Sequence, residues 1–306
     1  MAEYVTYGGN FLLPAPYECQ QVRGYGVAVD GDRAKMQALV DRLLNRKGGG
    51  PVYFVVLPTV LFTFMHMGVM QCAGRPELGC FSERELNITF MLAAVDGLSV
   101  RLVWYMPYLW LDCGPALIAG RDIYGFQKQM AKVTIPEWGE AAELAATAEV
   151  LHVQQSGVAA EMLDVFRMRR VGGILEKHSN ATNALAALDI LMTSVLQVPL
   201  ASILPPGLGL PGIDLGNLLM AFVRQLPSRE NFNLTCFRSV AEAPFSIVLR
   251  SAGLLEGNYE AVIPEHASVR LAQDLGIASG GVAVRAAYHL NIDFTLGVGT
   301  DLWTET

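Results

Sequence analysis

Hydrophobic and polar positions alternate most regularly near the end of the chain. From Val284 to Leu296 every second residue is apolar, and most residues between them are polar. A period of two over thirteen positions is typical of a long strand with one buried face. Phe245–Leu249 and Tyr259–Ile263 repeat the alternation more briefly. Antiparallel sheets with one solvated face give this pattern, so we predict antiparallel sheet here.

The first third of the chain predicts one helix among strands. Ala34–Arg46 has apolar residues at helical spacing, with Asp32 before it and three glycines after it. Pro51–Met65 is rich in β-branched and aromatic residues and predicts one or two buried strands. Leu86–Ala93 and Ser99–Leu111 predict two further strands, which lead toward the middle of the chain.

An unusually apolar stretch follows in the second half. Thr182–Leu200 is apolar on nearly every side and approaches the length that spans a bilayer. The interior Asp189 and the lack of flanking basic residues favour a buried helix over a membrane span. We therefore predict a helical insertion at about residues 181–223, buried against the rest of the domain or against a second subunit. The second arrangement would make the protein a homo-oligomer.

Composition limits the classes of partner. The chain has 306 residues, of which 52% are hydrophobic and 17% charged, which suits a single large domain over residues 1–306. The formal net charge is −7, and lysine and arginine form no run. This balance argues against nucleic acid or an anionic membrane surface as a partner. The expected partner is a small molecule.

The cysteines and histidines predict no metal and no cofactor. Five cysteines are odd in number and show no Cys-x-x-Cys spacing, and the five histidines form no His-x-x-x-His pair. No loop has the glycine spacing of a nucleotide site. Residues 1–9 lack the basic and apolar segments of a signal peptide, so a cytoplasmic location is expected.

One lysine stands out in the middle of the chain. Lys128 follows a run of glycine and aromatic residues, Gly120 to Phe126, in a chain with only five lysines. Such surroundings would leave an ammonium ion poorly hydrated, and poor hydration favours the neutral amine. A neutral amine can attack a carbonyl carbon and form a Schiff base. The alternative is a lysine that covers a strand edge with its charged end in water.

The motifs around Lys128 resemble the signature of the acetoacetate decarboxylase superfamily. In order, the matching segments are Leu111-Asp112, Pro115-Ala116, Gly120-Arg121-Asp122 and Phe126-Gln127-Lys128. Weaker matches at Arg23-Gly24-Tyr25, at Cys80 to Glu83 and at Leu254 to Gly257 extend the resemblance over most of the chain. The resemblance implies a mainly β (α+β) fold, an antiparallel closed β-barrel or cone with peripheral helices.

The resemblance also implies roles for individual residues. Lys128 would be the nucleophile, Arg23 would hold the substrate carboxylate by a bidentate contact, and Glu83 would move protons. Glu85 replaces Glu83 if the strand register slips by two residues, because the same face presents both. Family members generally carry a second lysine where this chain has Gln129. We expect Gln129 to contact the substrate as well.

Three hypotheses follow for the function. The first is a lyase that decarboxylates a β-keto acid through a lysine Schiff base, as the resemblance implies. The second is a Schiff-base aldolase, dehydratase or cyclase acting on an α-keto acid, which the loss of the second lysine at Gln129 favours. The third is a non-catalytic barrel that binds a small ligand, against which the retention of Lys128 argues.

Overall fold

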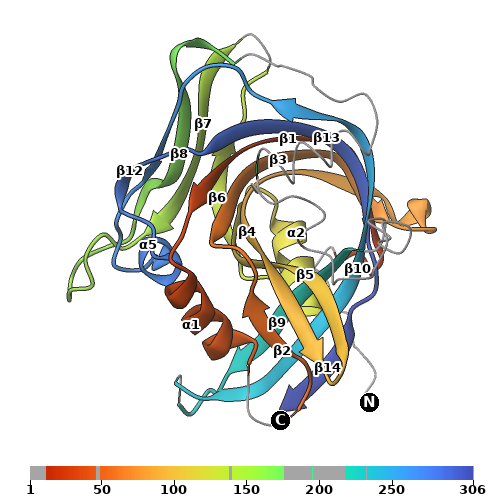
Figure 1. Cartoon of the computed structure of the whole chain (residues 1–306). Coiled ribbons are helices and arrows are strands. Elements are labelled where there is room, and N and C mark those ends of the chain that lie inside the picture. The colour runs from red at the N-terminus through yellow and green to blue at the C-terminus, as the bar shows by residue number, and fades with distance from the viewer. Residues whose placement is uncertain are drawn as a thin grey trace.

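The computed structural model describes residues 12–45, 49–137, 140–175, 195, 218–231 and 233–305. Strands dominate this part of the chain (Figure 1). The strands are β1 (Tyr17–Asp30), β2 (Val52–Val55), β3 (Thr59–Cys72), β4 (Cys80–Asp96), β5 (Ser99–Leu111), β6 (Lys128–Thr134), β7 (Ala141–Val150), β8 (Glu161–Ile174), β9 (Leu218–Pro227), β10 (Thr235–Leu254), β11 (Tyr259–Ile263), β12 (Gly280–Val282), β13 (Ala286–Leu296) and β14 (Thr300–Glu305). The helical segments are α1 (Arg33–Leu43), η1 (Pro76–Leu78), α2 (Gly114–Ala119), η2 (Gly120–Tyr124) and α5 (Leu271–Leu275).

Seven strands pair side by side in an order in which the last strand pairs again with the first. They pair in the order β5, β9, β10, β13, β1, β3 and β4, and β4 also pairs with β5. We call these seven strands the strand circuit, and Figure 1 shows several of them curving around α2. From β5 the sheet also continues through β6, β7, β8, β11 and β12. Only the pairings of β5 with β6 and with β9 are parallel among the described strands.

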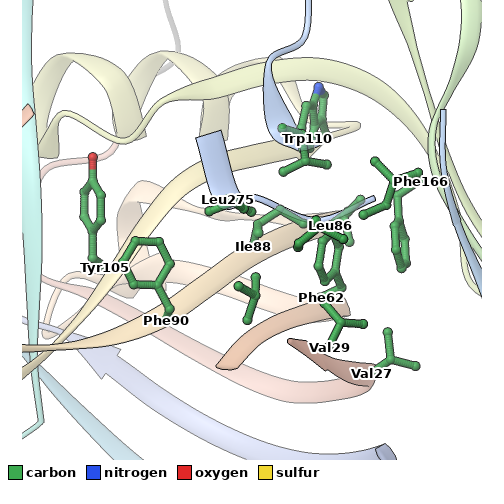
Figure 2. Packing of buried hydrophobic residues seen from close by; sticks show 14 of the residues in the cluster. Val27, Val29, Phe62, Leu86, Ile88, Phe90, Tyr105, Trp110, Phe166 and Leu275 are labelled. Atoms are coloured by element: carbon green, nitrogen blue, oxygen red, sulfur yellow. The ribbon is translucent and has the colours of Figure 1, made fainter. Parts of the chain in front are cut away.

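Alternate residues of the strand circuit point to opposite faces of the sheet and join different hydrophobic clusters. On the outer face, Phe62 of β3 and Leu86 of β4 join a large cluster with Phe166 of β8 and residues of α1 and α5 (Figure 2). The rings of Phe62 and Phe166 stack with centroids 4.4 Å apart. Burying a side chain of this size contributes about 1.5–3 kcal/mol. The outer face thus fixes β3 and β4, and their other residues point to the inner face.

Helix α1 protects the free edge of β2. Asp32 caps the helix by accepting hydrogen bonds from the backbone of Ala34 and Lys35. The Asn45 side chain accepts from the Tyr53 amide and donates to its carbonyl, at 2.7 and 2.8 Å. Gln37 of α1 accepts from the Val55 amide and donates to the Tyr53 carbonyl, at 2.8 and 3.0 Å. Asn45 and Gln37 thus satisfy backbone groups of β2 that would otherwise form an open sheet edge.

The structure confirms the mainly antiparallel β prediction. The predicted helix at residues 34–46 corresponds to α1, and the predicted strands correspond to β2, β3, β4, β5, β10, β11 and β13. The closed barrel or cone and the single domain over residues 1–306 stay predictions. No helix in the described ranges combines the length and hydropathy needed to cross a membrane.

The predicted helical insertion is wrong at its end. Residues 218–223 belong to β9, which pairs with β10 on one side and β5 on the other. Met220, Ala221, Phe222 and Val223 are all buried. A strand buried on both faces is continuously apolar, so its sequence resembles that of a buried helix. Apart from Val195, residues 181–217 lie outside the described ranges.

Candidate active site

A small cavity lies on the inner face of the strand circuit. Its volume is about 60 Å³, which is enough to hold water. The lining is mainly apolar, with three ionisable residues that are acidic or basic. It consists of Tyr17, Cys19, Met65, Met67, Met70, Glu83, Glu85, Met106, Leu109, Ala116, Ala119, Gly120, Tyr124, Phe126, Lys128, Met220, Phe245, Phe294 and Leu296.

A tight reversal of the chain delivers Lys128 to this cavity. Helix α2 continues into the π-helical turn η2, which ends at Gly125 in the left-handed conformation, with φ of +94°. The amides of Gly125 and Phe126 both donate to the carbonyl of Gly120, at 2.9 and 3.1 Å. A Cβ atom at Gly125 would lie 2.6 Å from the backbone nitrogen of Arg224, so this position requires glycine. Lys128 then begins β6, beside Leu109 of β5.

The side chain of Lys128 is buried between an aromatic ring and a glycine. It is 6% exposed, and its Nζ atom lies 5.3 Å from the centre of the Phe126 ring. An ideal Cβ atom at Gly120 would lie only 2.6 Å from Cδ and from Cε of Lys128. Gly120 therefore leaves the space through which the lysine reaches the cavity.

Glu83 is the nearest acidic group to this amine. Its Oε1 atom lies 3.8 Å from Nζ of Lys128, and its side chain is fully buried. Neither carboxylate oxygen accepts a hydrogen bond from a described residue. Burial raises the pKa of Glu83 to about 8, against the opposing effect of Lys128. Glu83 thus holds a proton near neutral pH.

Glu85 lies two residues along β4 from Glu83 and is the second buried carboxyl of the cavity. Its Oε1 atom accepts a hydrogen bond of 3.0 Å from Asn87, whose own oxygen accepts one of 3.2 Å from Thr89. Burial raises the pKa of Glu85, whereas Lys128 and the Asn87 hydrogen bond lower it. The negative charge of Glu85 adds to the rise in the pKa of Glu83.

The structure brings Lys128, Glu83 and Glu85 together but places Arg23 elsewhere. Cys19 and Val22 lie in the same inner cluster, because the strand register shifts between them and Gln21 has φ of +56°. This bulge moves Arg23 to the outer face, where its Nη2 atom lies 2.8 Å from Oε1 of Glu137. The prediction that Arg23 contacts the substrate is therefore wrong for this cavity.

Gln129 is also outside the cavity. It follows Lys128 on β6, is exposed and is not among the lining residues. Successive residues of a strand point to opposite faces, so a buried Lys128 turns Gln129 outward. The prediction of Gln129 as a substrate contact is wrong in this structure.

Sequence reasoning missed the polar row that continues from the two carboxyls. Glu83, Glu85, Asn87 and Thr89 occupy every second position of β4, with apolar residues between the last three. This alternation is visible in the sequence and could have indicated one polar face. The described ranges contain no group of three or more His, Cys, Asp or Glu residues arranged to hold a metal ion.

Comparison with known proteins agrees with the motif around Lys128. Residues 10–160 match the acetoacetate decarboxylase family. No curated protein sequence gives a match. The solved acetoacetate decarboxylase from Legionella pneumophila subsp. pneumophila str. Philadelphia 1 is similar in fold, with a TM-score of 0.64 at 14% identity. That alignment covers 99% of this chain and 93% of the Legionella chain.

Two similar structures carry other names. The enduracididine biosynthesis enzyme MppR, solved in complex with pyruvate, has a TM-score of 0.58 at 13% identity, over 97% of this chain and 93% of its own. An acetoacetate decarboxylase-like enzyme from Sphingomonas wittichii RW1 has a TM-score of 0.59 at 14% identity, over 99% of both chains. These likenesses support the fold, and the family match covers the segment that contains Lys128 and Glu83. Residues 10–160 of this chain thus carry the match to the acetoacetate decarboxylase family, and the chain has the fold of acetoacetate decarboxylase-like enzymes.

Proposed function

We propose that this protein is a lyase that forms a Schiff base between Lys128 and a keto acid, and that it decarboxylates a β-keto acid. The observation that carries the proposal is the buried pair of Lys128 and Glu83, 3.8 Å apart in a mainly apolar cavity. Members of the superfamily are enzymes. An amine beside a proton donor is the arrangement that imine formation requires.

The first step joins the amine to the substrate. The neutral nitrogen of Lys128 attacks the carbonyl carbon, and a proton passes from that nitrogen to the new alkoxide oxygen to give a carbinolamine. Glu83 donates a second proton to the carbinolamine oxygen, which leaves as water. The product is a protonated imine, and a carboxylate at Glu85 would offset its positive charge.

The second step breaks a carbon–carbon bond. In a β-keto acid, the bond to the carboxylate breaks and its electron pair moves toward the protonated imine nitrogen, so that carbon dioxide leaves and an enamine remains. Glu83 takes up a proton again from solvent and delivers it to the enamine carbon, which restores the protonated imine. Water then hydrolyses the imine, which releases the ketone and frees Lys128.

The second candidate is a condensation or dehydration on an α-keto acid. MppR, which shares this fold, was solved with pyruvate and also with the condensation product of pyruvate and imidazole 4-carboxaldehyde. An α-keto acid on Lys128 would lose a proton, not carbon dioxide, to give the enamine, and Glu83 or Glu85 would accept that proton. The same residues thus support both candidates.

Reductive trapping tests the proposal. The protein is incubated with acetoacetate or with pyruvate, treated with borohydride, and analysed by intact mass and peptide mapping. We expect a reduced adduct on the peptide that contains Lys128. Release of carbon dioxide from acetoacetate supports the decarboxylase, and an adduct with pyruvate without such release supports the second candidate. Absence of any adduct would contradict both and favour a protein that only binds its ligand.

A further inference from the structure

The inner wall of the strand circuit changes from acidic to apolar across neighbouring strands. Met67 of β3 lies opposite Glu83 of β4 in the sheet register. Val22 of β1 lies next to Met67, and Ile292 of β13 lies next to Val22. Adjacent strands are about 4.8 Å apart. The wall is therefore apolar for three successive strands beyond the carboxyl that faces Lys128.

A second row of residues, two positions along the same strands, shows the same change from acidic to apolar. Met65 lies opposite Glu85, and Gly24 and Leu290 follow in the same order. An ideal Cβ atom at Gly24 would lie 2.9 Å from a terminal carbon of Leu290, so the leucine side chain occupies the space above the glycine. Of these residues Met65 and Met67 line the cavity, and the lining continues in the sheet register through Met70 of β3, Cys19 of β1 and Phe294 of β13.

The charges of the lining restrict the substrate. Among the described lining residues Lys128 is the only base, and Glu83 and Glu85 are the acids. The protonated imine formed on Lys128 can balance a single substrate carboxylate, whereas a second would face carboxyls or apolar side chains. Burying an unpaired carboxylate is strongly unfavourable. Dicarboxylic keto acids are therefore disfavoured.

Methionine makes the apolar wall adaptable. Five lining residues are methionines, out of 12 in the whole chain. Methionine is unbranched and flexible, so it fills gaps of irregular shape and moves aside for ligands of different length. The lining residues Met65, Met67, Met70, Met106 and Met220 come from β3, β5 and β9.

We propose that the substrate is a monocarboxylic keto acid with an unbranched apolar chain, which runs from Lys128 across β3 toward β1 and β13. This proposal rests on the Schiff-base function proposed above, because that function places the carbonyl group at Lys128. The apolar chain of the substrate contacts Met67 and Met70 and reaches toward Cys19 and Phe294.

A homologous series tests the chain preference. Acetoacetate, 3-oxopentanoate and 3-oxohexanoate are compared by kcat/KM for carbon dioxide release and by the rate of borohydride trapping. One buried methylene is worth about 0.8 kcal/mol, or roughly fourfold, so each added carbon should raise kcat/KM about fourfold until the cavity is full. The dicarboxylate 3-oxoglutarate should react at least about tenfold more slowly than 3-oxopentanoate. Equal reactivity along the series, or preference for the dicarboxylate, would overturn the proposal while leaving the Schiff base intact.

A matched pair of variants tests whether the apolar chain of the substrate lies against β3. Met67 is 1% exposed in the wall, whereas Met130 on β6 is 49% exposed and does not line the cavity. Met67→Gln should remove most of the gain from 3-oxopentanoate to 3-oxohexanoate, and Met130→Gln should keep it. The same gain in both variants would contradict the proposed path of the chain.

A binding measurement separates this proposal from the lysine chemistry. Hexanoate and adipate have the same number of carbons but cannot form an imine, and their effects on the unfolding temperature are compared at equal concentration. Hexanoate should raise the unfolding temperature more than adipate and more than acetate. This result, together with no adduct from any keto acid, would refute the Schiff base and retain an apolar ligand. Equal effects of the three acids would refute the proposal that the substrate carries an apolar chain.

Discussion

Replacing Gly120 with alanine should disable the lysine without harming the fold. The new Cβ atom would lie 2.6 Å from Cδ and Cε of Lys128. Carbon atoms in contact are about 3.5–4.0 Å apart, so the lysine side chain has to move by roughly 1 Å. A displacement of that size in a reacting group can reduce a rate about 100-fold.

The backbone at Gly120 accepts alanine. Its φ and ψ are −64° and −39°, which are ordinary helical values. At such a position Gly→Ala stabilises a protein by about 0.4–1 kcal/mol, because it restricts the unfolded chain. We therefore expect Gly120→Ala to keep or slightly raise the unfolding temperature, while the rate of borohydride trapping falls about 100-fold.

Gly114→Ala is the matched control, since it lies in the preceding helix and no atom lies within 4 Å of its ideal Cβ. It should trap keto acids at the wild-type rate. A wild-type trapping rate in Gly120→Ala would show that the reactive lysine does not lie over Gly120. A large fall in its unfolding temperature would show that the change acts on the fold.

Three further predictions concern the groups around the amine. The pKa of Glu83 is raised to about 8 from 4.5. Its contribution to stability is therefore full below about pH 4.5 and is lost as the pH rises through about 8. In urea titrations over that pH range, Glu83→Gln should lose less free energy of unfolding than the wild-type protein. Asn87→Leu removes the hydrogen-bond donor to Glu85 and should therefore raise the pKa of that carboxyl. The acid limb of the pH profile of kcat/KM should then move to higher pH. An unmoved limb would contradict the role of this hydrogen bond. Gln129→Lys places a cation on the exposed side of β6 and should leave the pH dependence of trapping unchanged, and a shift would show that residue 129 reaches the amine.

Local sequence patterns predicted seven of the 14 described strands but not where a strand changes the direction of its side chains. β5 covers Ser99–Leu111 as predicted, and the late alternation corresponds to β13. Arg23 was misplaced because the bulge at Gln21 reverses the alternation of β1, and no residue pattern marks that bulge. Residues 218–223 were misassigned because β9 is buried on both faces from Met220 to Val223 and so has no polar face.

The candidate site was only partly accessible to sequence reasoning. The resemblance pointed to Lys128 and Glu83, and the structure places them 3.8 Å apart. The role of Gly120 depends on the path of the lysine side chain through space, which spacing along the chain does not reveal. The apolar wall depends on the register of β4, β3, β1 and β13, which come from distant parts of the sequence.

The central claim is that Lys128 forms the covalent intermediate, and one pair of variants tests it most directly. Lys128→Arg retains a positive charge but supplies no neutral amine near neutral pH, whereas Lys132→Arg changes an exposed residue four positions along β6. Each folded variant is treated with acetoacetate or pyruvate and borohydride and analysed by intact mass. We predict that the adduct disappears in Lys128→Arg and persists in Lys132→Arg. An adduct that persists in Lys128→Arg would contradict the account.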